Sequence, residues 1–143
     1  MLTFAEAVAA HRAADFETAR LGYEAALPKL NAALNLASLH YHHGQHDEAE
    51  RLFRLIVAQR PGNADARYGL SLVLLATSRY AEGWALYEAR RCRPNTFAPD
   101  TSSPEWQGDP VVRKHLVVCG EQGFGDQIQF ARYLPELARR DVS

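Results

Sequence analysis

Four histidines lie close together near the middle of the chain: His40, His42, His43 and His46. Imidazole is a common zinc ligand, and residues three apart on a helix share a face. The pairs His40–His43 and His43–His46 therefore have a spacing that would suit a metal site. Gly44 is expected to end a helix between His43 and His46, and no cysteine or carboxylate completes a site at suitable spacing. We therefore expect structural histidines and predict no metal site.

A glycine-rich turn near the C-terminus is the second place where the residue types suit chemistry. Gly123 and Gly125 precede Asp126, just before an apolar helical pattern over 127–140. Glycine permits a tight turn and a helix N-terminus attracts anions, so both glycines are candidate phosphate-binding residues, although their spacing differs from G-x-G-x-x-G. Asp126 with Gln129 also fits a capping box at the start of this helix.

Composition narrows the range of partners. The 143 residues carry a net charge of −1, so no basic field favours nucleic acid or an anionic membrane. No apolar run approaches the length of a membrane span, and the N-terminus lacks the residue order of a signal peptide. Cys92 and Cys119 lack metal-type spacing and are expected to be free thiols, as in a reducing compartment. We predict a cytoplasmic protein that uses no cofactor.

The elements that position these groups follow from a repeated helical pattern. Between residues 34 and 61 two amphipathic patterns meet at Gly44, and Pro61 ends the second. The pattern returns 34 residues later over 64–95, and a fainter copy precedes it over 2–27. We expect helix pairs within 2–27, turning near 13–15, then at 31–43 and 47–59 with Asn31 as an N-cap, and at 64–77 and 80–91.

This offset, with small residues where helices cross and an aromatic residue in the second helix, resembles the tetratricopeptide repeat (TPR). The resemblance covers residues 1–93 and implies a mainly α fold, an array of about three helical hairpins that binds a protein or peptide partner. An ordinary helical hairpin domain is the alternative. The first repeat lacks a glycine at its turn and is expected to fray most.

In TPR arrays the first helix of each pair lines a concave groove, so the resemblance assigns groove positions here. They are Phe4, Val8, His11, Arg12, Leu34, Ser38, Tyr41, His42, Tyr68, Leu72 and Leu75. This surface is apolar and aromatic, and it lacks the Lys and Asn set by which some TPR proteins clamp acidic chaperone tails. We expect it to bind a peptide or helix with apolar or aromatic side chains; alternatively, the C-terminal helix of this chain packs against it.

After the repeats the composition changes twice. Residues 94–113 are rich in proline and small polar residues, which predicts a linker that no helix crosses, with Trp106 docked on a neighbouring surface. Residues 114–143 open with the continuous apolar run 116–119, typical of a strand covered on both faces, followed by the glycine-rich turn and the helix. We expect the first β-turn-α unit of a truncated α/β domain.

This closing unit resembles the start of the catalytic region of bacterial TPR proteins fused to a glycosyltransferase-like domain, related to the two-lobed heptosyltransferase (family 9, GT-B) enzymes. The matching residues are Trp106 and Gly108, the run 116–119, the turn 121–126 and the helix 129–135. The resemblance implies that Asp126 deprotonates the acceptor hydroxyl in a full-length enzyme. In such enzymes the second lobe chiefly holds the nucleotide-sugar, and this sequence lacks that lobe, so we expect no catalysis by this chain alone.

A single buried strand has no ladder partner within the chain, and an unpaired buried backbone group costs about 1–3 kcal/mol. We therefore expect residues 94–143 to form a homodimer, by strand pairing or by exchange of helix 127–140. The alternative is that this helix folds back and caps the third repeat. Three functions stay open: a TPR interaction module, which we favour, the N-terminal fragment of a TPR-fused glycosyltransferase, and a self-associating scaffold.

Overall fold

The computed structural model describes residues 2–93, 102–110, 115–121 and 123–139. The chain divides into two compact units, Met1–Thr96 and Phe97–Ser143. The described residues are mainly helical, and among them no helix is both long enough and apolar enough to cross a membrane.

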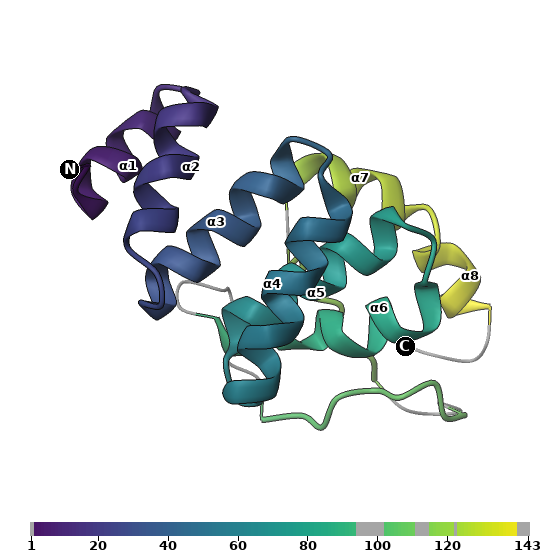
Figure 1. Cartoon of the computed structure of the whole chain (residues 1–143). Coiled ribbons are helices and arrows are strands. Elements are labelled where there is room, and N and C mark those ends of the chain that lie inside the picture. The colour runs from purple at the N-terminus through teal and green to yellow at the C-terminus, as the bar shows by residue number, and fades with distance from the viewer. Residues whose placement is uncertain (1, 94–101, 111–114, 122, 140–143) are drawn as a thin grey trace. The chain divides into compact units, whose positions relative to one another are not determined.

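The first unit consists of three helical hairpins in series (Figure 1). Their helices are α1 (Phe4–Arg12) and α2 (Phe16–Ala25), α3 (Leu30–His42) and α4 (His46–Gln59), and α5 (Ala64–Ala76) and α6 (Tyr80–Tyr87), followed by the short 3-10 helix η1 (Glu88–Cys92). The two helices of each hairpin pack on each other, and α2 and α4 also pack on the first helix of the next hairpin. The predicted mainly α fold of helical hairpins is confirmed.

Side-chain caps start three of these helices. Thr3, Asp15 and Asn63 precede α1, α2 and α5, and in each case a side-chain oxygen accepts a hydrogen bond from a backbone N–H of the first turn. The prediction that Asn31 is an N-cap is wrong. Lys29 holds the cap position of α3 without a side-chain bond, so Asn31 already lies inside the first helical turn.

Close helix crossings explain the small residues in the repeat pattern. A Cβ on Gly22 would lie 2.5 Å from the Cβ of Ala7, and a Cβ on Gly69 would lie 2.3 Å from the ring of Phe53. Phe53 is buried in an apolar core that runs through all three hairpins. Glycine at these crossings therefore lets α2 approach α1 and lets α5 approach α4.

The turn inside each hairpin uses a left-handed backbone conformation. Gly44 has φ +74°, and the corresponding turn residues Ala14 and Ser78 have φ +59° and +62°. Glycine adopts this region freely, whereas a residue with a Cβ is strained there by about 1–2 kcal/mol. The first and third turns therefore contain strain that the second avoids.

The second unit contains the helices α7 (Phe124–Ala131) and α8 (Leu134–Ala138). The prediction of one helix over 127–140 is wrong within the described residues. Pro135 lies in the first turn of α8 and has no N–H to continue the α7 hydrogen-bond ladder, so the chain restarts as a second helix. The predicted cap at Asp126 is also wrong, because Gly123 holds the N-cap position of α7 and Asp126 lies in its first turn.

The strand predicted at 116–119 is not formed. Residues 115–121 contain no strand, and both Val117 and Val118 are exposed. A lone strand leaves its backbone groups without ladder partners, so an open chain that hydrates them is the stable alternative.

In the linker, residues 102–110 form no helix, while 94–101 and 111–113 lie outside the described residues. The indole Nε1 of Trp106 donates a hydrogen bond to the Asp109 carbonyl oxygen at 2.7 Å, and its side chain is 39% exposed. Trp106 is therefore held by a contact within its own segment.

Candidate functional site: a groove along the first helices

The first helices of the hairpins line a groove of about 620 Å³, which we call the first-helix groove. Its lining residues are Phe4, Asn31, Leu34, Asn35, Ser38, Tyr41, His42, Phe53, Asp65, Tyr68, Gly69, Leu72 and Arg93. Phe53 reaches it from α4 and Arg93 follows η1, whereas the others belong to α1, α3 and α5. The groove thus combines aromatic and aliphatic side chains with amides and one carboxylate.

The structure brings together most of the residues predicted for a groove. Those that line it are Phe4, Leu34, Ser38, Tyr41, His42, Tyr68 and Leu72. Val8 instead packs against the core, and Leu75 lies against Gly83, where α5 crosses α6. His11 Nδ1 lies 3.1 Å from the hydroxyl of the buried Tyr23, and Arg12 is exposed outside the groove. Burial lowers the pKa of His11, with smaller contributions from His42 and His43.

Sequence reasoning missed several polar groove residues. On α3, Asn31 precedes Leu34 by three residues and Asn35 precedes Ser38 by three, so helical periodicity alone places them on the same face. Asp65 precedes Tyr68 by three residues on α5, and the same argument applies. Arg93 gives no such signal, because it reaches the groove from beyond the last helix of the array.

One end of the groove is an aromatic and charged cluster. The guanidinium of Arg93 lies 4.4 Å from the centroid of the Tyr68 ring, and its Nε donates to Asp65 Oδ1 at 2.8 Å. Tyr68 and Tyr87 lie with ring centroids 5.6 Å apart. Burial raises the pKa of Tyr68. The neighbouring Tyr87 raises the pKa of Tyr68 further, while Arg93 lowers it. This end therefore presents an aromatic face beside a carboxylate.

His40, His43 and His46 lie against aromatic rings, and His42 lines the first-helix groove. His40 is buried, with Nδ1 beside Gln45 Oε1 and the Phe16 ring edge-on to it. His43 also packs against Phe16, at 4.1 Å between ring centroids, and His46 lies near Tyr41. Across the described ranges, no group of three or more His, Cys, Asp or Glu residues is arranged to hold a metal ion.

A second, larger cleft of about 1160 Å³ lies along the second helices and was not predicted. Its apolar lining comes from α2, α3, α4 and the turn before α3, and includes Phe16, Leu27, Leu30, Leu52, Leu55 and Ile56. Charged residues of both signs border it, among them Arg20, which pairs with Glu17 and Glu24 at 2.8 Å. These charges largely neutralise one another, so the cleft has no marked charge preference.

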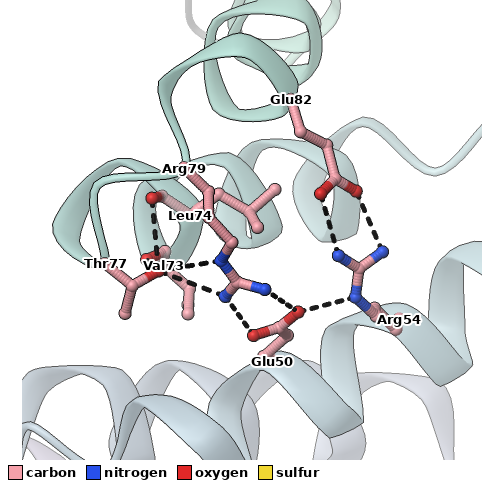
Figure 2. Close-up of polar contacts among 7 residues, drawn as sticks. All are labelled: Glu50, Arg54, Val73, Leu74, Thr77, Arg79 and Glu82. Atoms are coloured by element: carbon pink, nitrogen blue, oxygen red, sulfur yellow. Dashed lines mark hydrogen bonds and ion pairs between the residues drawn. The ribbon is translucent and has the colours of Figure 1, made fainter.

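An ion-pair network holds the third hairpin on the second (Figure 2). Glu50 on α4 accepts hydrogen bonds from Arg79, at the N-cap of α6, and from Arg54. Arg54 also pairs with Glu82 on α6 at 2.9 Å. Arg79, followed by Arg54, lowers the pKa of Glu50 to about 2 despite partial burial. The network fixes α6 relative to α4 and so supports the α5 face that lines the groove.

The residues of the glycine-rich turn lie in the second unit. Gly123, Gly125 and Asp126 are all exposed, and the Asp126 backbone N–H donates to the Gly123 carbonyl at 3.1 Å. Asp126 therefore faces solvent in the first turn of α7, and the helix start is closed by its own backbone.

The tetratricopeptide repeat model matches residues 2–64 and again 34–95, which together cover the three hairpins. Protein FlbA of Caulobacter vibrioides is 36% identical over 73 residues, which are 50% of this chain and 12% of that protein. The present chain thus spans only a small part of the length of this relative. The offset of the hairpins and the match over residues 2–95 lead to one conclusion: the chain belongs to the tetratricopeptide repeat family.

Proposed function

We propose that this chain binds a segment of a partner protein in the first-helix groove. Tetratricopeptide repeats suggest a protein-interaction module, and the observation that carries the proposal is the strip of half-buried Leu34, Tyr41, Tyr68 and Leu72 along α3 and α5. These side chains remain partly accessible, so a ligand can bury them further. Burying one large apolar side chain stabilises a complex by about 1.5–3 kcal/mol.

The polar residues of the groove give the partner an orientation. Asn31 is exposed and Ser38 half-buried on the same face of α3 as Leu34 and Tyr41, so amide and hydroxyl groups border the apolar strip. A segment that places apolar side chains on the strip brings its backbone polar groups near these donors and acceptors. We therefore expect a short apolar or aromatic-bearing segment to be the ligand.

The test is selection of peptides from a random library on the purified chain, followed by titration calorimetry of the selected peptides. The proposal expects peptides whose affinity depends on Tyr41 and Leu72. Peptides that bind equally well to Tyr41→Ala and Leu72→Ala variants would place the binding site elsewhere.

Self-association is a second candidate, which we propose for residues 94–143. The favouring observation is the apolar surface of α7, where Phe124 is 83% and Ile128 76% exposed. Exposed large apolar side chains this close together are typical of interaction surfaces. Since 116–119 forms no strand, helix contacts rather than strand pairing would carry the association.

A glycosyltransferase role is proposed only for a longer chain that includes a donor-binding lobe. There the exposed Asp126 would act as the base, and Gly123 and Gly125 would approach a phosphate group. Sugar transfer from nucleotide-sugars by this chain alone, lost in Asp126→Asn, would contradict the expectation that the chain by itself is not catalytic.

A further inference from the structure

The end of the first-helix groove already holds an arginine side chain. Arg93 is the residue directly after η1, and its side chain reaches back to α5. Its guanidinium lies over the Tyr68 ring at 4.4 Å while its Nε donates to Asp65 at 2.8 Å. Asp65 and Tyr68 are three residues apart on α5, so the carboxylate and the ring face the same arginine.

This pair of groups suits a guanidinium in particular. A guanidinium is planar, so it stacks on an aromatic face while its N–H groups donate to a carboxylate beside the ring. A lysine ammonium offers no flat surface to stack. Tyr68 and Asp65 therefore form a subsite with the chemistry of arginine recognition, and Arg93 demonstrates the fit.

The contacts of Arg93 are weak enough to be exchanged. The side chains of Arg93 and Asp65 are 39% and 47% exposed, and ion pairs this accessible to water contribute little. A ligand arginine would make the same two contacts and would bring along neighbouring residues that bury Leu72, one helical turn further along α5. The contact that Arg93 makes within the chain does not bring this additional burial of Leu72.

We propose that the Asp65–Tyr68 subsite takes an arginine side chain of the partner segment, and that Arg93 occupies it in the free chain as an internal competitor. This inference rests on the proposed function of the first-helix groove. It gives the partner a defined chemistry: an arginine placed next to an aliphatic or aromatic residue that reaches Leu72. Removal of Arg93 then opens the subsite, and neutralisation of Asp65 weakens it.

The test is selection of random peptides on the full chain and on its Arg93→Gln variant. The expected result is enrichment of arginine in both pools, stronger in the variant pool. A selected peptide should bind Arg93→Gln about 2–5-fold more tightly than the unaltered chain, which is the range of an exposed cation–π contact. The same peptide with citrulline in place of arginine should lose this gain, and Asp65→Asn in the Arg93→Gln background should lose it as well.

The outcomes distinguish a failure of the arginine subsite from a failure of the proposed groove function. Peptides that require Leu72 but show no arginine preference, or that favour acidic residues, would overturn the arginine subsite and leave the groove function standing. Selected peptides that do not require Leu72 would overturn the groove function and the subsite with it. The citrulline peptide is measured against unaltered protein as well, so the result does not depend on the folding of any variant.

Discussion

The guanidinium of Arg79, at the N-cap of α6, donates to the carboxylate of Glu50 on α4 across a gap of 29 residues in sequence. This contact joins two hairpins whose first helices line one groove. Because Arg54 and Glu82 extend the pair into a network, the third hairpin is positioned by charge as well as by the core (Figure 2). The stability of the array should therefore respond to the charge on Glu50.

We predict that Glu50→Gln lowers the free energy of unfolding by about 1–2 kcal/mol at neutral pH. This loss is smaller than the full pKa shift of Glu50 would give, because Arg79 is partly exposed and water screens the ion pair. The folded-state pKa of Glu50 is about 2, below its ordinary 4.5. Its contribution is thus complete above the ordinary pKa and is lost as the pH falls towards 2. Urea unfolding of both proteins across this range should show the difference shrinking.

The matched control for that measurement is Glu48→Gln. Glu48 pairs with Arg51, one turn along the same helix, and both side chains are more than half exposed. Its removal should change stability by less than about 0.5 kcal/mol at any pH. An equal effect of both substitutions would mean that the inter-hairpin network contributes nothing specific.

The left-handed turn of the first hairpin gives a second prediction. Ala14→Gly should raise the free energy of unfolding by about 0.5–1 kcal/mol, because glycine removes the strain at φ +59°. Gly44→Ala should lower it by a similar amount at φ +74°. Gly62→Ala, at a position with open space and no positive φ, is the control and should be nearly neutral. Thermal denaturation followed by circular dichroism measures all three.

A third prediction concerns the crossing of α4 and α5. Gly69→Ala adds a Cβ that would lie 2.3 Å from the buried Phe53 ring. The gain in helix propensity is about 1 kcal/mol, but overpacking costs about 1–3 kcal/mol, so net destabilisation is expected. The double variant with Phe53→Leu should recover part of the loss. A more stable Gly69→Ala protein would show that the crossing has room that the structure does not indicate.

The hairpins could be predicted from the sequence because apolar and small residues recur at helical spacing, and because the second and third hairpins repeat at an offset of 34 residues. The residue at which each helix begins was harder to predict, as Asn31 shows, because neighbouring residues compete for the cap position. The strand predicted at 116–119 rests on a continuous apolar run and on a family resemblance, although a strand depends on a ladder partner that no local pattern supplies. Arg93 lies 28 residues from Asp65, and no local spacing indicates that contact.

A fourth prediction tests self-association. If α7 forms a contact between copies, multi-angle light scattering should show a dimer that Ile128→Asp converts to a monomer, because a carboxylate cannot be buried in an apolar interface without loss. Gln129→Asp, on the same helix at another exposed position, is the control. A monomer for the unaltered chain would exclude the homodimer.

The measurement closest to the central claim is titration calorimetry of a selected peptide against groove variants. Tyr68→Ala and Leu72→Ala should each weaken binding about tenfold or more, since each removes apolar surface that the ligand buries. Tyr80→Ala and Leu21→Ala remove large exposed side chains that lie outside the groove, and should leave the affinity unchanged. Equal affinity for all five proteins would contradict the assignment of the first-helix groove as the binding site.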